Sequence, residues 1–141
     1  MPELTRNLVM AVPQQKIFLA VTQFENYPKF LSEVTSAKQS TTADPKKFRV
    51  DFTLDIVKTF KYSLEFHVPN ENEVAWRLLE SDFFKKNEGT WRFKAAGDKT
   101  EVGYDLKVEF GFMVPGFIAK KLTEVSLPKM FDAFEKRARK L

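Results

Sequence analysis

The last stretch of the chain, residues 114–141, constrains the fold most, because it is the longest segment with a helical hydrophobic period. Ile118, Leu122 and Val125 form one apolar stripe. A second, slightly rotated stripe consists of Leu127, Met130, Phe131, Phe134 and Ala138. Pro128 lies where the stripe changes phase and removes one backbone donor, so we expect the helix to bend there. A long helix with one apolar face needs a large apolar surface to pack against.

The rest of the chain supplies that surface as strands in which apolar and polar residues alternate. Alternation places all apolar residues of a strand on one face of a sheet. The positions predicted to face inward are Leu4, Leu8, Met10 and Val12; Phe48, Val50, Phe52, Leu54 and Ile56; Phe60, Tyr62, Leu64, Phe66 and Val68; Val74, Trp76 and Leu78; Trp91, Phe93 and Ala95; and Val102, Tyr104, Leu106, Val108 and Phe110. A polar edge strand is expected over 33–42, and a charged connection over 81–88.

Two short helices are expected after the first strand. Pro13 suits a first helical position, and residues 17–24 carry a helical spacing. Asn26-Tyr27-Pro28 then interrupts the helix, because a residue before proline avoids helical angles. The predicted order is β-α-α-β-β-β-β-β-β-α in one α+β domain, 1–141. A curved antiparallel sheet of about seven strands would wrap around the C-terminal helix, with a cavity between them.

Composition excludes several kinds of site. The chain has 141 residues, no cysteine and one histidine, which excludes disulfides, thiolate catalysis and a metal site with several histidines. The alternation places His67 on the polar strand face, away from Tyr62. No run is long enough to span a membrane and no signal-peptide pattern is present, so we expect the cytoplasm or a membrane surface facing it.

Two other compositional features are open to interpretation. The net charge of +4 depends mainly on the C-terminal end, Lys136, Arg137, Arg139 and Lys140. Cations there complement the helix dipole, and a patch for RNA or anionic lipid is the alternative. The 15 phenylalanines suit either a large packed core or the wall of an apolar pocket.

Four polar side chains are predicted to face inward: Arg6, Tyr62, Glu80 and Tyr104. A buried charge must find a partner, reach water or line a wet cavity, and exposure at a strand end is the simpler explanation for Arg6 and Glu80. A tyrosine can line an apolar pocket while its hydroxyl orients a ligand.

The segment that leads into the last helix, 110–118, contains nine residues and no charge. Gly111, Phe112, Met113 and Gly116 could form an apolar gate over the cavity or touch a membrane while a lipid transfers. The alternative is that Phe112, Met113 and Phe117 cap the core.

Several local strings carry a family resemblance: AVP at 11–13, FENYPKFL at 24–31, WRLLE at 76–80, GTWRF at 89–93, and the segment 110–125. Together with the element order, they make the chain resemble the START-like superfamily and its helix-grip fold. More narrowly, it resembles the polyketide cyclase/dehydrase and coenzyme Q-binding branch. The resemblance implies a hydrophobic ligand such as an isoprenoid quinone or lipid, and no required cofactor. It carries over no single catalytic motif.

Three functions follow as hypotheses. The first is binding of a hydrophobic small molecule between sheet and helix. The second is a cyclase or dehydratase in which Tyr62, Tyr104, Glu80 or Arg6 transfers protons. The third, from the toxin branch of the family, is inhibition of ribosomal subunit association. The residues predicted to line the cavity are Phe52, Leu54, Tyr62, Leu64, Phe66, Trp76, Leu78, Glu80, Trp91, Phe93, Tyr104, Leu106, Val108, Phe110, Phe117, Ile118, Leu122 and Val125.

Overall fold

The computed structural model describes residues 3–56 and 58–141. Its elements are β1 (Glu3–Met10), α1 (Gln14–Thr22), the 3₁₀ helix η1 (Phe24–Lys29), β2 (Val34–Thr41), β3 (Lys47–Ile56), β4 (Lys58–Asn70), β5 (Glu73–Ser81), β6 (Phe84–Ala96), β7 (Lys99–Phe110), α2 (Gly116–Lys121), the π-helical turn η2 (Leu122–Ser126) and α3 (Leu127–Arg139). This order confirms the α+β prediction.

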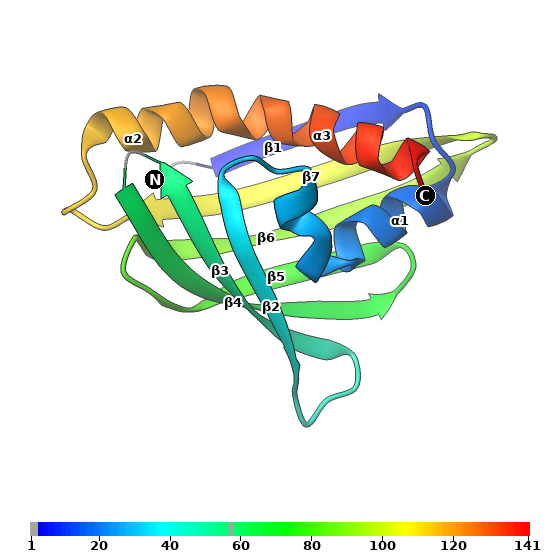
Figure 1. The fold of residues 1–141 in the computed structure, drawn as a ribbon. Helices are drawn as coiled ribbons and strands as arrows, with labels where there is room; N and C mark the ends of the chain where they lie inside the picture. The colour runs from blue at the N-terminus through cyan, green and yellow to red at the C-terminus, as the bar shows by residue number, and fades with distance from the viewer. Residues whose placement is uncertain (1–2, 57) are drawn as a thin grey trace.

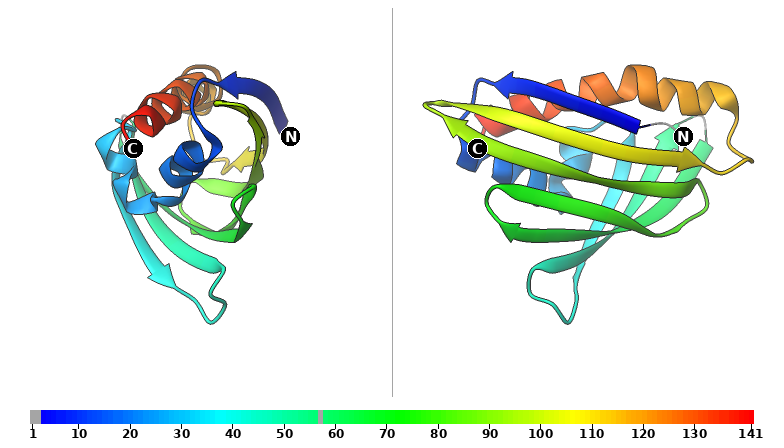
Figure 2. Two further views of the ribbon diagram at one scale, coloured as in Figure 1. Left: turned by 90° about the vertical axis from the view of Figure 1, so that its right-hand side faces the viewer. Right: turned by 180° about the vertical axis from the view of Figure 1, so that it is seen from behind.

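The seven strands form one antiparallel sheet in the order β1-β7-β6-β5-β4-β3-β2. The sheet is strongly curved, and α2, η2 and α3 run as one long helix across its concave side (Figure 1). Seen along the helix, the sheet curls around it, while α1 and η1 fill the space beside the end of α3 (Figure 2). The arrangement follows from the alternation, because the apolar face of each strand turns toward the helix.

Irregularities in strand pairing change which residues face inward. Between β4 and β5, Ser63 lies opposite Glu80 and Leu64 lies opposite Leu78, so Leu79 is an extra residue on β5. A bulge of this kind reverses the alternation beyond it. The prediction that Glu80 faces inward is therefore wrong. Its carboxylate lies on the outer face, 2.9 Å from the guanidinium of Arg49.

The long helix changes phase through a π-helical turn rather than by a simple proline bend. The N–H of Leu127 donates to the carbonyl of Leu122, five residues earlier. Pro128 follows in the first turn of α3 and has no N–H to offer the preceding turn. The wider turn inserts an extra residue into the helical period. It explains why the second apolar stripe is rotated from the first.

Aromatic side chains hold α1, η1 and α3 against the sheet at one end. Phe24 of η1 stacks on Phe66 of β4 with 4.2 Å between ring centroids. Phe134 of α3 meets the rings of Tyr27 and Trp91 edge to face, at 5.3 and 5.2 Å. The Tyr27 hydroxyl donates to the carbonyl of Val21 at 2.6 Å. Because each ring buries a large apolar area, this cluster fixes the helix over the sheet.

A cavity between sheet and helix as candidate functional site

A cavity of about 500 Å³ remains between the concave side of the sheet and the long helix. That volume lies within the range of ligand pockets, roughly 300–1,000 Å³. We call the side formed by strands β3 to β7 the sheet wall. It consists of Phe52, Leu54, Tyr62, Leu64, Phe66, Trp76, Phe84, Asn87, Trp91, Tyr104, Leu106, Val108 and Phe110. The other side, which we call the helical wall although it includes Val34 at the start of β2, consists of Tyr27, Phe30, Leu31, Ser32, Glu33, Val34, Lys121, Leu122, Thr123, Val125, Ser126, Leu127, Lys129, Met130, Ala133 and Phe134.

Most residues that the sequence assigned to the cavity do line it. The thirteen are Phe52, Leu54, Tyr62, Leu64, Phe66, Trp76, Trp91, Tyr104, Leu106, Val108, Phe110, Leu122 and Val125. Eleven of them come from strands, where a regular alternation sufficed to place them. Their role in binding a ligand stays a prediction.

The other five residues assigned to the cavity lie elsewhere. Glu80 faces outward for the reason given above. Leu78 packs on the core opposite Leu64 without reaching the hollow. Phe93 lies toward α1, where it meets Phe18 edge to face at 6.4 Å. Ile118 is buried in α2 and Phe117 is 63% exposed, so neither lines the cavity.

The segment predicted to be a gate projects into solvent. Phe112 and Met113 are 88% and 77% exposed, so the alternative that they cap the core is wrong. The N–H of Gly111 donates to the carbonyl of Phe83 at 2.9 Å, which ties the start of the segment to the sheet. Gly116 begins α2 with open space beside it. None of these residues lines the cavity, and movement of the segment stays a prediction.

Two residues of the sheet wall were missed because the expected connection over 81–88 is mostly strand. β6 starts at Phe84, and Lys85 is the extra residue of a bulge opposite β7. Phe84, just before this bulge, and Asn87, after it, both reach the cavity. The polar residues at 85–88 concealed the strand, although the alternation of Trp91 and Phe93, extended back through Gly89, would have placed Asn87 inward.

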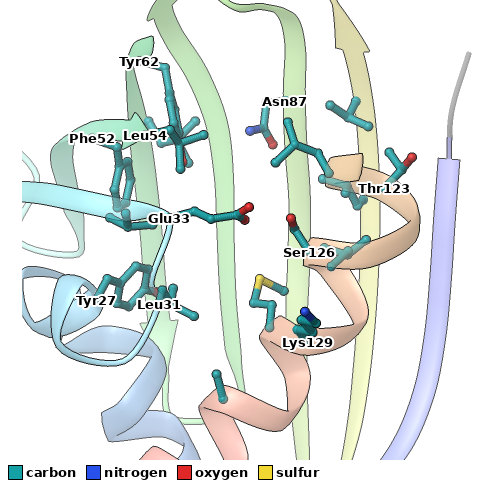
Figure 3. A pocket seen from close by; sticks show the side chains of 18 of the residues that line it. Tyr27, Leu31, Glu33, Phe52, Leu54, Tyr62, Asn87, Thr123, Ser126 and Lys129 are labelled. Carbon is teal, nitrogen blue, oxygen red and sulfur yellow. The ribbon is translucent and has the colours of Figure 1, made fainter. Parts of the chain in front are cut away.

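Asn87 is held in a defined orientation by its neighbour Trp76. The indole N–H of Trp76 donates to Oδ1 of Asn87 at 2.9 Å. An indole nitrogen can only donate, so the amide oxygen must face it and the amide NH₂ must point elsewhere. Figure 3 shows this amide in the hollow between the sheet and the helix. Gly89 permits the arrangement, because a Cβ there would lie 2.5 Å from the Trp76 ring.

Two of the chain's three tyrosines present their rings to the hollow from the sheet wall. Tyr62 stacks on Phe52 with 5.1 Å between centroids, and Tyr104 lies 5.5 Å from Trp76. Burial raises the pKa of both hydroxyls, and the neighbouring Tyr62 raises the pKa of Tyr104 further. Both tyrosines are therefore neutral hydrogen-bond donors at physiological pH.

Charged groups gather at the mouth of the cavity, on the helical wall. The Glu33 carboxylate lies 3.7 Å from the amine of Lys121, so this ion pair joins the loop after η1 to α2. Figure 3 shows Glu33 extending into the hollow, with Ser126 and Lys129 on the helix at the opposite side. From the sheet wall, none of the described residues that line the cavity is charged.

Three further observations concern groups and segments outside the cavity. Arg6 is exposed on the edge strand β1 and does not line the cavity. Within residues 3–56 and 58–141, no group of three or more histidine, aspartate or glutamate side chains is placed to hold a metal ion. In the same residues, no helix is long and apolar enough to cross a membrane.

Comparison with known proteins identifies the family of the fold. Residues 10–135 match the family model described as polyketide cyclase/dehydrase and lipid transport. A START superfamily protein from Mycobacterium smegmatis is 26% identical, with a TM-score of 0.80 over 98% of this chain and 97% of that one. A protein from Thermus thermophilus is 22% identical, with a TM-score of 0.79 over 97% of both chains. The START-like helix-grip fold is thereby confirmed.

A third similar structure is an aromatase/cyclase from Streptomyces sp. R1128. It is 12% identical, with a TM-score of 0.78 over 98% of this chain and 93% of that one, which is a likeness of fold. Among proteins with curated descriptions, none matches the chain.

Proposed function

The chain belongs to the family of polyketide cyclases/dehydrases and lipid transport proteins, and from this premise we propose that it binds a hydrophobic small molecule, such as an isoprenoid quinone or another lipid, in the cavity. The observation that carries the proposal is the hollow of about 500 Å³ in an otherwise packed aromatic core. Empty space in a core costs stability, because the residues around it lose contacts. A ligand would restore those contacts.

Intrinsic fluorescence offers a direct test. The chain has two tryptophans, and Trp76 and Trp91 both line the cavity. Binding of decylubiquinone should quench their emission in a saturable manner. Native mass spectrometry of gently purified protein, followed by lipid extraction, should identify a bound molecule. Protein that carries no lipid and shows no saturable quenching would contradict the proposal.

A variant that fills the cavity provides the matched control. Val108 is buried on the sheet wall, and Val108→Trp should occupy the hollow and abolish quenching of Trp76 and Trp91. Val9 is 59% exposed outside the cavity, and Val9→Trp should bind the quinone as the unmodified chain does.

We further propose that the β7–α2 segment touches a membrane surface while a lipid transfers. Phe112, Met113 and Phe117 expose apolar side chains, and the exposed Lys120 and Lys121 follow them in α2. Aromatic residues beside lysines suit an anionic bilayer surface. The chain should sediment with phosphatidylserine-containing vesicles more than with phosphatidylcholine vesicles. Phe112→Ser should reduce this binding without changing quenching by decylubiquinone.

A second candidate function is a cyclase or dehydratase. Of the four groups considered, Tyr62 and Tyr104 line the cavity, which supports the hypothesis, whereas Glu80 and Arg6 lie outside. The tyrosines could protonate an oxygen of a folded substrate. Incubation with a linear poly-β-ketone thioester and mass spectrometry would test it. A ring-closed product that has lost water, absent with the Tyr62→Phe/Tyr104→Phe double variant, would support catalysis.

The ribosome hypothesis is supported by a basic groove beside η1 and α3. Its cations are Lys29, Lys129, Lys136, Arg137 and Lys140, and among the described residues Asp132 is the only carboxylate that lines it. Nε of Arg137 is buried there with no hydrogen-bond partner among the described residues. Sedimentation of ribosomal subunits with and without the protein tests this function. No change at moderate salt would count against it, since contacts with RNA phosphates should persist there.

A further inference from the structure

Three side chains of the sheet wall offer hydrogen-bond donors for which the described residues supply no acceptor. Among residues 3–56 and 58–141, the hydroxyls of Tyr62 and Tyr104 and the amide NH₂ of Asn87 make no hydrogen bond to protein, whereas the Asn87 oxygen is used by Trp76. None of these donor atoms is sealed away from open space, because Arg137 Nε is the only fully buried side-chain nitrogen or oxygen without a partner in the described residues. Because all three side chains line the cavity, the hollow is open space available to these donors.

The third tyrosine shows what a purely structural hydroxyl looks like in this core. Tyr27 also touches the cavity with its ring, yet its hydroxyl donates to the carbonyl of Val21 at 2.6 Å. Buried polar groups in proteins are nearly always paired in this way. Tyr62 and Tyr104, on the other wall of the same cavity, have no such partner among the described residues. A bound molecule with acceptor atoms would supply the missing hydrogen-bond partners of Tyr62 and Tyr104.

The charge distribution indicates a neutral acceptor at this wall. Tyr62, Tyr104 and Asn87 are uncharged donors, and the charged groups of the cavity, Glu33, Lys121 and Lys129, lie on the helical wall. An anion would be held more strongly by arginine or lysine, and a cation by carboxylates. Neutral N–H and O–H donors within aromatic rings match the carbonyl oxygens of an apolar ring system.

The positions of the three donors indicate that a ligand would present more than one acceptor oxygen to this wall. Tyr104 and Asn87 both adjoin Trp76, one by ring contact at 5.5 Å and the other by the indole hydrogen bond. Tyr62 approaches from β4, between the rings of Phe52 and Phe84, each with centroids at 5.1 Å. The donors thus come from three strands, β4, β6 and β7, and lie among the aromatic rings of the sheet wall.

We propose that the sheet wall recognises a neutral, ring-shaped ligand through two or more carbonyl oxygens, as in a quinone or an aromatic polyketone, and that Tyr62, Asn87 and Tyr104 donate the hydrogen bonds. This inference rests on the proposed function, because it names the chemical class of ligand for the same cavity. It selects oxygenated rings over plain hydrocarbon lipids of similar size.

A matched pair of probes isolates the contribution of the oxygens. Menadione and 2-methylnaphthalene share one carbon skeleton and differ by two carbonyl oxygens. The chain contains no cysteine, so menadione cannot form thiol adducts with it. Affinities are measured by displacement of N-phenyl-1-naphthylamine from the cavity. We expect menadione to bind at least tenfold more tightly than 2-methylnaphthalene, in keeping with two satisfied donors.

Conservative variants assign the effect to the three donors. Tyr62→Phe and Tyr104→Phe each remove one unpaired hydroxyl, and Asn87→Asp keeps the oxygen that accepts from Trp76 while removing the amide donor. Each should weaken menadione binding about fivefold and leave 2-methylnaphthalene binding unchanged. Glu80→Gln, on the outer face of the sheet, should change the affinity for neither menadione nor 2-methylnaphthalene.

The outcomes separate this inference from the proposed function. Equal affinity for both probes, or a menadione preference that survives all three variants, would overturn the assignment of carbonyl recognition and leave hydrophobic binding intact. Failure of N-phenyl-1-naphthylamine and both probes to bind would overturn the cavity as a ligand site, and the inference with it. Unchanged thermal unfolding of the two Phe variants would verify that they fold.

Discussion

The two walls of the cavity differ in how they are built and in which polar groups they carry. The sheet wall consists of paired strands whose rings contact one another, and its polar groups are neutral. The helical wall contains a 3₁₀ helix, a loop and a π-helical turn, and it carries Glu33, Lys121 and Lys129. The difference suggests separate tasks. The sheet wall would recognise the ligand, and the helical wall would control access to it.

The largest predicted effect comes from removing the contact that joins the walls. Phe134 is 2% exposed and meets Tyr27, Phe30 and Trp91 with centroids 5.1 to 5.3 Å away. Phe134→Ala should lower the free energy of unfolding by about 4 kcal/mol, as expected for a buried ring. Denaturant titration followed by tryptophan fluorescence measures it.

The matched control for Phe134 is an exposed ring. Phe112 is 88% exposed, and Phe112→Ala should change stability by less than about 0.5 kcal/mol. A small effect of Phe134→Ala would mean that the helical wall is held mainly by its other contacts.

The next prediction concerns the sheet wall alone. At Gly89 a Cβ would meet the backbone oxygen of Asp105 and the ring of Trp76. Gly89→Ala should cost about 2 to 3 kcal/mol, because either the strand or the indole must move. The same displacement should weaken the hydrogen bond from Trp76 to Asn87 and shift the tryptophan emission. Gly97→Ala is unsuitable as a control because its φ is 68°; Gly116→Ala, with open space around it, serves instead.

The same contrast explains how far sequence reasoning could go. Strand alternation predicted the sheet wall wherever pairing is regular, as at Phe52, Leu54 and Tyr104. It failed after the bulge at Leu79, where one extra residue reverses the alternation, so Glu80 was placed inward. Asn87 was missed because residues 81–88 were expected to form a connection and not the start of a strand. A bulge depends on pairing between strands, and the sequence of one strand does not encode it.

The helical wall was harder to predict for a different physical reason. The phase change near Pro128 was visible, and the structure accommodates it with a π-helical turn. Which helical residues line a hollow depends on the depth to which the helix sits in the sheet. That depth is set by contacts between distant residues such as Phe134 and Trp91. For the same reason nothing in the sequence placed Glu33 near Lys121.

A third prediction tests whether hydroxyls on the two walls have different roles. Tyr27→Phe leaves the carbonyl of Val21 without its donor and should cost about 1 to 2 kcal/mol. Tyr62→Phe removes a hydroxyl that has no protein acceptor among the described residues and should leave stability within about 0.5 kcal/mol. Thermal unfolding of both variants measures the difference. Equal losses would indicate that the Tyr62 hydroxyl has a structural partner after all.

A fourth prediction concerns the π-helical turn. Pro128→Ala restores an N–H that can donate to the preceding turn, which favours α-helical geometry over the wider turn. Stability should change by less than about 1 kcal/mol, because the gained hydrogen bond offsets the altered packing. The rotation of Leu122 and Val125, which line the cavity, should alter quenching by decylubiquinone. Unchanged quenching would show that the turn has no role in shaping the helical wall.

The smallest thermodynamic effect is expected at the mouth, where Glu33 and Lys121 connect the loop to the helix. This pair is partly exposed at 3.7 Å, so Lys121→Gln should change stability by less than about 0.5 kcal/mol. Its effect should appear in kinetics, because opening the mouth requires the loop and α2 to separate. Release of N-phenyl-1-naphthylamine, followed by stopped-flow fluorescence, should become about twofold faster, and high salt should reproduce the change in the unmodified chain.

Glu33→Gln should have the same effect, and the double variant should add nothing further, since both changes break one pair. If only one variant accelerates release, that side chain acts on the ligand itself, and the helical wall takes part in recognition as well as access.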